Sequence, residues 1–241
     1  MGCEPGCPLP APVNGTAVAR VDCHVHTRGS YDSAEPLEEV LSSAAASGLD
    51  GVIVTDHDCI TYARAAVERG EALGLIGIPG VEVSTTDGHL LGLGLGTRPP
   101  SGLPFDETVT RVRNAGGLAV VPHPFQLSRH GVPADAITDC DGIEVFNAHA
   151  LTGLRNWQTT RFAVRRGYSQ FAGSDAHRAT AVGSAYTEVC VGSRNLTAEA
   201  VLAAMRAGRV RPVGSRFSPR RYFGKLAQSA RHSSARLLGG D

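Results

Sequence analysis

The stretch Val21-Asp22-Cys23-His24-Val25-His26 (VDCHVH) ends a short apolar run near the start of the chain. Residues i and i+2 of a strand point to the same side, so the His24 and His26 side chains can bind one ion. Two interpretations are open at this point. The histidines are incidental polar residues at a strand end, or they are the first ligands of a metal site.

The later apolar runs end in the same way and favour the metal site. Histidines and carboxylates follow in TDHD at 55–58, GVEVS at 80–84 with His89 after it, VVPHP at 120–124, GIEVFN at 142–147 and GSDAH at 173–177. Six of the nine histidines therefore share one class of position, which is hard to obtain by chance. Nitrogen ligands mixed with carboxylates suit zinc, manganese or iron better than calcium.

Apolar runs of strand length alternate with helical patterns through the body of the chain. Helices are expected at 37–46, 61–73, 105–114, 151–166 and 197–207, and residues 75–84 are expected to form a single strand. Such alternation predicts an α/β fold with a parallel sheet, and this many units suggest closure into a barrel. In a closed α/β barrel the carboxyl ends of the strands converge on one face, where active sites lie.

The composition is that of an ordinary globular protein, with 42% hydrophobic and 19% charged residues. The formal net charge is zero, so whole-molecule electrostatics give no case for binding nucleic acid or a membrane. No apolar run approaches the roughly 20 residues of a membrane span. The first residues also lack the basic and apolar regions of a signal peptide. We therefore expect a cytoplasmic protein that does not bind membranes.

The two ends of the chain differ from its body. Residues 1–16 are rich in proline and glycine and are expected to be a poorly ordered tail, in which Cys3 and Cys7 form a weak CxxxC pair. From Arg209 onward there are seven arginines and one lysine against a single acid. We interpret residues 215–241 as a basic tail, which is either a solvated end or a site for a phosphate-rich partner.

The ordered motifs DCHVHT, TDHD, GVEVS with the following histidine, VVPHP, GIEVFN and GSDAH resemble the PHP (polymerase and histidinol phosphatase) domain family. The resemblance covers roughly residues 18–191, and we expect residues 17–214 to form this domain. It implies a distorted (β/α)₇ barrel with a cluster of up to three metal ions. It also implies hydrolysis of phosphoesters, among them small phosphomonoesters, nucleotides and DNA or RNA ends.

Carried over position by position, the resemblance implies a set of metal ligands. Leucine is more usual in the family where this chain has Cys23, whose side chain we expect to face away from the metals. The implied ligands are His24, His26, Glu82 and Asp175 at the first metal, Glu82, His89 and His123 at the second, and Asp32, His57 and His177 at the third.

Several polar residues beside these motifs have candidate supporting roles. Asp22, Asp56 and Asp58 either orient imidazoles by accepting their second N–H or are surface acids. Of the three remaining histidines, only His149, just past GIEVFN, is a candidate residue of the metal site. His130 lies in an expected loop.

The predicted mechanism is metal-assisted hydrolysis. The metals bind phosphate oxygens, lower the pKa of a bridging water and stabilise the charge on the leaving oxygen. We predict that Glu82, Asp175 and His177 are catalytic, together with Arg129 and Arg178, whose planar guanidinium groups suit phosphate oxygens. No GxSxG or GxxxxGK[ST] motif occurs, and the mechanism needs no protein nucleophile.

Other functions stay open at this point. The neutral charge favours a small phosphomonoester or nucleotide over long duplex DNA, while an exonuclease acting on short RNA or DNA ends is the nearest alternative. An amidohydrolase whose two metal ions are bridged by a modified lysine of the barrel is excluded, because the sole lysine, Lys225, lies beyond the last expected barrel strand. An amidohydrolase whose metal ions are bridged by Glu82 is not excluded. The non-enzymatic alternative is an inactive metal-binding or nucleotide-binding barrel.

Overall fold

The computed structural model describes residues 16–150 and 153–214, whose strands form two five-stranded sheets. The sheet orders are β10-β9-β1-β2-β3 and β4-β5-β6-β7-β8. The first sheet contains β1 (Ala17–Val25), β2 (Gly51–Val54), β3 (Ile76–Gly77), β9 (Ala185–Val191) and β10 (Val210–Gly214). The second contains β4 (Gly80–Ser84), β5 (His89–Leu93), β6 (Leu118–Val121), β7 (Gly142–Asn147) and β8 (Ser169–Gly173).

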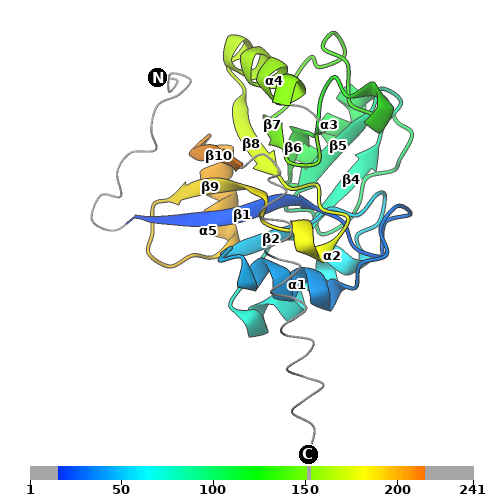
Figure 1. The fold of residues 1–241 in the computed structure, drawn as a ribbon. Coiled ribbons are helices and arrows are strands. Elements are labelled where there is room, and N and C mark those ends of the chain that lie inside the picture. The colour runs from blue at the N-terminus through cyan, green and yellow to red at the C-terminus, as the bar shows by residue number, and fades with distance from the viewer. Residues whose placement is uncertain (1–15, 151–152, 215–241) are drawn as a thin grey trace, which may run out of the picture.

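Helices connect these strands, with α1 toward the bottom and α4 toward the top of Figure 1. They are α1 (Leu37–Ala46), α2 (Thr61–Gly70), α3 (Phe105–Asn114), α4 (Gly153–Arg166) and α5 (Ala198–Arg206). Short 3₁₀ turns lie at η1 (Glu71–Leu73), η2 (Leu127–Arg129) and η3 (Ala179–Ala181). Both α1 and α3 start after a proline and carry two acids in the first turn, which suit the positive end of a helix dipole.

The α/β prediction is confirmed, but the expected parallel sheet was wrong because both sheets are mixed. β1 pairs with β2 in parallel, and β7 pairs with both β6 and β8 in parallel. In contrast, β9 pairs with both β1 and β10 in antiparallel fashion, and so does β5 with β4 and β6. β4 and β5 are joined by a short turn, which antiparallel strands permit and parallel strands do not. Within the described residues these ladders do not form one closed ring, so the (β/α)₇ barrel stays a prediction.

Two isolated bridges connect the sheets. Val25 pairs with Ala176 and His57 with Glu82, both in parallel. One apolar cluster contains buried side chains from both sheets, including Val21, Ile53, Leu91, Val120 and Phe171. Cys23 is buried in the same cluster. The Cys23 thiol therefore belongs to the core, as expected. The shared core and the bridges keep the strand ends of the two sheets together.

The structure also differs from the expected strands and helices at three places. Residues 75–84 form two strands in different sheets, separated by Pro79, which has no N–H to donate to a ladder. The sequence pattern missed β10, whose Pro212 is tolerated because this strand lies at a sheet edge. The expected helix at 61–73 continues past Gly70 only as η1.

Some predictions lie partly or wholly outside the described residues. These are the tails at 1–16 and 215–241, the Cys3 and Cys7 pair, and the start of the helix expected at 151–166. Among the helices that the structure describes, none is both long and apolar enough to cross a membrane.

Candidate metal centre

The fold brings all nine predicted metal ligands together at one place. Each belongs to at least one group of three or four side chains whose ligand atoms lie within 4.8 Å of one another. Seven of the nine are buried, while His177 is half-buried and Asp32 is exposed. The residues come from β1, β4, β5 and the segments that follow β1, β2, β6 and β8: His24, His26, Asp32, His57, Glu82, His89, His123, Asp175 and His177.

The first predicted group has nearly tetrahedral spacing. His24 Nε2 lies 3.1 Å from His26 Nε2 and 3.1 Å from Glu82 Oε2, and His26 Nε2 lies 3.2 Å from Glu82 Oε2. Asp175 Oδ1 lies 3.6 Å from His24 Nε2 and 3.4 Å from His26 Nε2. Ligands at zinc-like bond lengths on the corners of a tetrahedron are about 3.3 Å apart. These five distances fit one ion bound by all four atoms.

Glu82 faces a second group with its other oxygen. Its Oε1 lies 3.0 Å from His89 Nδ1 and 3.1 Å from His123 Nε2. Because Oε2 belongs to the first group, the two oxygens of one carboxylate point at two different histidine pairs. This is the arrangement required of a carboxylate that bridges two metal ions.

The third predicted group is more open to solvent. Asp32 Oδ2 lies 2.9 Å from His177 Nε2 and 3.3 Å from His57 Nε2. His57 Nδ1 on the opposite side of the ring lies 3.6 Å from Glu82 Oε2, so this ring stands between the third group and the shared glutamate.

Unsatisfied buried atoms provide an independent test of fit to metal ions. Asp175 Oδ1, His89 Nδ1 and His57 Nδ1 are buried and have no hydrogen-bond partner. Buried polar atoms are nearly always hydrogen-bonded, and each exception needs an explanation. These three atoms point toward the groups described above, and nitrogen and carboxylate donors suit first-row divalent metals. A fourth buried atom without a partner, His123 Nδ1, is the ring nitrogen that does not face Glu82. The residues therefore fit metal ions.

Glu144 on β7 holds two of the histidines. Its Oε1 accepts a hydrogen bond from His24 Nδ1 at 3.0 Å, which directs Nε2 at the first group. Its Oε2 accepts from the His123 backbone N–H at 2.9 Å and from Asn147 Nδ2 at 2.8 Å. His26 is oriented by Ser30, whose Oγ lies 2.8 Å from His26 Nδ1.

Neither alternative holds for the three aspartates as a set, because none has a hydrogen bond to an imidazole ring within the described residues and Asp22 and Asp56 are buried. The Asp22 carboxylate accepts from the backbone N–H groups of Ser174 and Gly183, each at 2.9 Å, and burial raises its pKa to about 6 despite these bonds. Asp56 accepts from Thr27, and Asp58 accepts from the Ser84 N–H at 3.0 Å. These carboxylates fasten the loops that carry the histidines instead of contacting the rings.

Arg129 lies over the cluster, and its role in phosphate binding stays a prediction. It donates to Asp175 Oδ2 and, at 3.3 Å, to Asn147 Oδ1, and it lines a cavity of about 370 Å³ above the metal groups. His149 lines the same cavity and forms a further candidate group with Asp175 and His177. Arg178 is exposed and does not contribute to this lining, so its role stays a prediction.

Sequence reasoning did not assign a role to Glu144 or Ser30. Glu144 had a usable signal, because it lies in GIEVFN among the strand-end carboxylates. Ser30 gave no comparable signal, since a serine in a loop is common and its contact with His26 depends on how that loop folds.

The backbone around the cluster is strained. Asp175 has φ 51° and His123 has φ 29°, a left-handed region that non-glycine residues seldom occupy and that is concentrated at functional sites. Gly173 lies so close to the cluster that a Cβ there would be 2.5 Å from His24 Cβ and 2.7 Å from Glu144 Oε1.

The Gly173→Ala substitution is therefore expected to displace His24 and Glu144. The added methyl should lower the free energy of unfolding by about 1–3 kcal/mol and weaken metal binding. Urea unfolding and a chelator titration measure the two effects. Gly192→Ala is the matched control, since its Cβ would meet nothing within 4 Å. Equal effects of the two substitutions would contradict the close packing at Gly173.

The histidines and carboxylates of the cluster shift one another's pKa values, because they carry opposite charges. Burial raises the pKa of the Glu82 carboxyl, but the charge of His24 and the hydrogen bond from His123 outweigh it, so that pKa lies well below its usual range. Burial lowers the pKa of His26, but the nearby carboxylates of Asp175 and Glu82 outweigh it and raise the pKa to about 9. The carboxylates of Asp175 and Glu82 likewise raise the pKa of His24 against the effect of burial.

Metal binding at pH 7.5 is expected to release protons. His26 has its pKa at about 9 without metal, so its ring is protonated at pH 7.5 and must lose that proton to bind an ion. Affinity should therefore rise with pH up to that value. Calorimetric titration of metal-stripped protein in buffers of different ionisation enthalpy counts the protons. A heat that is independent of the buffer would contradict this expectation.

The fold and site together define a metal-dependent hydrolase. Residues 22–159 match the PHP domain family, and residues 153–210 match a family described as PHP-associated. The chain belongs to the PHP domain family and is a metal-dependent phosphoesterase.

Curated relatives include an uncharacterized protein and two named phosphoesterases that the chain matches over about a third of their length. The uncharacterized protein MJ1587 of Methanocaldococcus jannaschii is 33% identical over 149 residues, which are 57% of this chain and 86% of that protein. A phosphoribosyl 1,2-cyclic phosphate 1,2-diphosphodiesterase of Eggerthella lenta is 38% identical over 86 residues, 33% of this chain and 32% of its own. A 3',5'-nucleoside bisphosphate phosphatase of Chromobacterium violaceum is 35% identical over 88 residues, 35% of this chain and 30% of its own.

Solved structures share the fold at low sequence identity. A two-domain Bacteroides vulgatus protein that contains a predicted PHP-like metal-dependent phosphoesterase superposes with a TM-score of 0.70 at 18% identity, over 89% of this chain and 69% of that one. A lesion-specific endonuclease from Pyrococcus furiosus superposes with a TM-score of 0.57 at 17% identity, over 85% of this chain and 60% of its own. At these identities the comparisons concern the fold alone.

Proposed function

We propose that the protein hydrolyses a small phosphomonoester or nucleotide at a centre of two or three divalent ions. The observation that carries the proposal is Glu82, whose two oxygens face two different histidine groups. Manganese, zinc and iron suit the nitrogen and carboxylate donors. When bound, such ions bind phosphate oxygens and supply a water activated near neutral pH. The two relatives with named activities act on a phosphoribosyl cyclic phosphate and a nucleoside bisphosphate, which supports a small phosphorylated substrate.

The protein's own residues would orient the substrate. Arg129 lies at the border of the cavity and would donate to a phosphate oxygen through its guanidinium. Glu144 and Ser30 would keep the His24 and His26 rings in their binding tautomers. Asp175 and Glu82 would offset the charge of the ions.

We also propose that residues 17–214 form one domain with a distorted seven-stranded ring. The two isolated bridges extend the order β4-β5-β6-β7-β8 through β1 and β2 back to β4. That closure supports the predicted (β/α)₇ barrel, with β9 and β10 as additions to β1. It would explain why ligands from distant parts of the sequence reach one rim.

The Arg129→Gln substitution is expected to raise KM for a phosphomonoester about tenfold, because a charge-assisted hydrogen bond to phosphate is lost. Steady-state kinetics with metal-loaded enzyme measure this change. Arg194→Gln is the control, since Arg194 is exposed and lies outside the cavity lining. An unchanged KM in the Arg129 variant would remove this residue from the substrate site.

A substrate panel tests the proposed function directly. The protein is loaded with manganese, zinc or iron, analysed for metal content and assayed on phosphomonoesters, cyclic nucleotides, oligonucleotides and amides. Phosphate release that depends on metal is expected. Turnover of amides alone would indicate an amidohydrolase, and bound metal without any turnover would indicate an inactive barrel.

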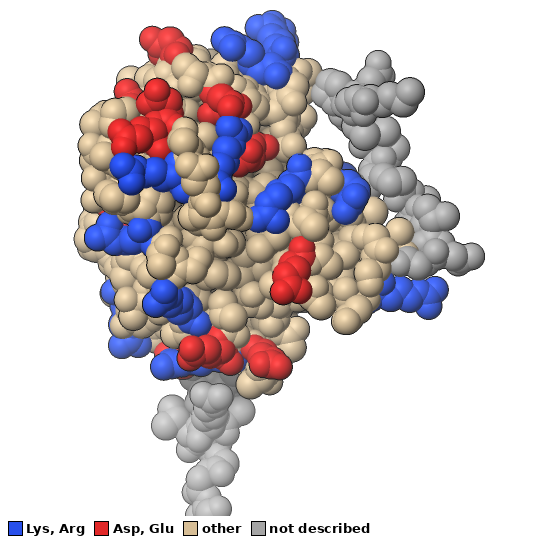
Figure 2. Space-filling model, turned by 180° about the vertical axis from the view of Figure 1, so that it is seen from behind, with Lys and Arg blue, Asp and Glu red and all other residues tan. Residues whose placement is uncertain are grey.

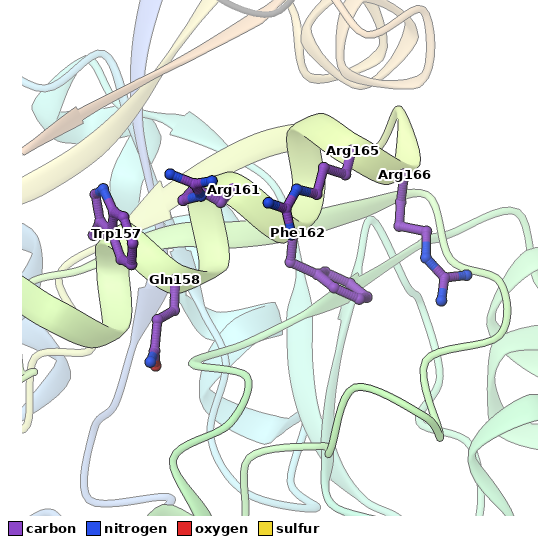
Figure 3. Close-up of a pocket in the computed structure, with 6 residues that line it drawn as sticks. All are labelled: Trp157, Gln158, Arg161, Phe162, Arg165 and Arg166. Carbon is purple, nitrogen blue, oxygen red and sulfur yellow. The ribbon is translucent and has the colours of Figure 1, made fainter.

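A second candidate function, an exonuclease acting on short RNA or DNA ends, is favoured by α4. This helix contains four arginines and no acid, and Figure 2 shows basic side chains at the end of the molecule where α4 lies. Figure 3 shows Arg161 beside Trp157, with the guanidinium carbon 4.9 Å from the ring centroid. Trp157 is exposed and, with five other α4 residues, lines a hollow of about 520 Å³.

Aromatic rings beside arginines bind single-stranded nucleic acid by stacking and charge. If α4 holds a strand, Trp157→Ala should weaken binding of a single-stranded oligonucleotide about tenfold. Arg161→Gln should reduce the slope of log affinity against log salt by about 0.7. Neither change should alter hydrolysis of a mononucleotide. If oligonucleotide binding is the same in both variants as in the original protein, this candidate is rejected.

A further inference from the structure

Tyr31 is an exposed aromatic residue at the edge of the metal cluster. Its side chain is 78% exposed, the largest value among the exposed large hydrophobic residues that the structure describes. One face of the ring stacks on His57, with centroids 4.8 Å apart and planes inclined by 22°. The opposite face is therefore open to solvent, next to a predicted metal ligand.

The loop that carries Tyr31 is fixed on both sides of this residue. Ser30 Oγ accepts from the His57 backbone N–H at 2.9 Å and lies 2.8 Å from His26 Nδ1. Asp32 Oδ2 lies within 3.3 Å of ring nitrogens of both His57 and His177. With both neighbours bound to the cluster, the position of Tyr31 is set by the same contacts that place the histidines.

Tyr31 lines a cavity of about 370 Å³ that does not include His57 among its walls. It is lined by Tyr31, by Leu127, which is 73% exposed, by His130, and by the turn between β4 and β5. The cavity above the metal cluster shares Tyr31, His89 and His130 with it. Tyr31 therefore lies where the two cavities meet, with the metal groups lining one cavity and Leu127 and the β4–β5 turn lining the other.

This division of the space matches a ligand with a phosphate at one end and a flat ring at the other. Every nucleobase has a π-face that stacks on an aromatic side chain, and the volume falls within the usual range of small-molecule pockets. Thr85, Thr86 and Asp87 also line this cavity, but their hydroxyl and carboxylate groups bond one another and the backbone of the turn, so stacking would supply most of the contact with a base. A phosphorylated sugar without a base would leave the Tyr31 end unfilled.

We propose that the cavity between Tyr31 and Leu127 is a nucleobase subsite, so that the substrate is a nucleotide and Tyr31 is its stacking platform. The inference rests on the proposed function, because it assumes that the phosphate lies at the metal groups. It deepens that function by naming the substrate class. It applies equally to a free nucleotide and to the terminal nucleotide of a short strand.

The test compares two substrates that differ in the base. Metal-loaded Tyr31→Ala protein is assayed on adenosine monophosphate and on ribose 5-phosphate, beside Tyr31→Phe and the control Leu73→Ala, whose side chain is exposed and outside the cavity. We expect Tyr31→Ala to raise KM for the nucleotide about tenfold, with kcat and the KM for ribose 5-phosphate unchanged. Tyr31→Phe and Leu73→Ala should behave like the original protein.

Binding gives a readout that does not depend on turnover. The probe is the methylene phosphonate analogue of adenosine monophosphate, whose phosphorus–carbon bond resists hydrolysis. Tyr31→Ala should weaken its binding about tenfold but leave binding of inorganic phosphate unchanged. Equal loss for both ligands, or no loss for either, would overturn the subsite. Absence of turnover on every phosphoester would refute the proposed function, and the binding comparison would still decide on the subsite.

Discussion

The Glu82→Gln substitution is expected to reduce phosphoester hydrolysis by about a thousandfold or more. The amide replaces one carboxylate oxygen with an NH₂ group, which cannot bind a metal, so one of the two histidine groups that Glu82 faces loses its shared ligand. Metal ions supply several kcal/mol of charge stabilisation in phosphoester hydrolysis, and each 1.36 kcal/mol corresponds to about a tenfold change in rate. The measurements are kcat/KM on a phosphomonoester and metal content by elemental analysis.

Two controls make the Glu82 result interpretable. Glu199→Gln changes an exposed glutamate on α5 and should leave both the rate and the metal content unchanged. A thermal melt of Glu82→Gln shows whether the buried substitution still folds. A folded variant that keeps its metal and its rate would contradict the bridging role of Glu82.

The second large effect is expected at Glu144. In Glu144→Gln, an NH₂ group replaces one of two oxygens that accept from His24 Nδ1, the His123 backbone and Asn147. Two N–H donors then face each other, so the His24 ring loses its fixed orientation. Loss of such a supporting hydrogen bond typically costs 10–100-fold in metal affinity or activity, and we expect a loss of about this size.

Competition with a chelator of known affinity measures the Glu144 effect. Comparison with Ser30→Ala separates the two orienting contacts, because Ser30 touches His26 and not His24. Metal affinity that is unchanged in Glu144→Gln, with the fold intact, would mean that the His24 orientation is set by something other than this hydrogen bond.

Local sequence patterns predicted the helices well. The bounds expected for the helices at 37–46 and 105–114 agree with the structure, because each begins after a proline and has acids in its first turn. α4 and α5 lie within the ranges expected for them. These signals need only neighbouring residues.

Strand pairing was harder to predict, because it depends on contacts between distant segments. The apolar run at 75–84 reads as one strand, but the chain changes sheets at Pro79. The pattern contains no indication that β9 and β10 extend the sheet from β1 in antiparallel fashion. β-propensity describes a half-buried pleated surface and says little about which strand is the partner.

The candidate site was largely predictable, because most of its ligands lie at or just past the ends of strands, although Glu82 lies within β4, His89 begins β5 and Asp32 lies in a loop. The nine side chains gather as the resemblance to the PHP family implied, while their service as metal ligands stays a prediction. The supporting contacts were less predictable. Asp56 is next to His57 in sequence but binds Thr27, while Glu144, which is 120 residues from His24, holds its ring. Adjacency along the chain does not determine which carboxylate reaches an imidazole.

Anomalous diffraction from crystals of the metal-loaded protein tests the central claim most directly. Data collected on either side of the absorption edge of zinc or manganese locate the bound ions. We predict a strong peak among His24, His26, Glu82 and Asp175, and a second peak between Glu82, His89 and His123. Loaded crystals with no anomalous peak at these side chains, or with peaks only elsewhere on the protein, would contradict the proposed metal centre and the hydrolysis that depends on it.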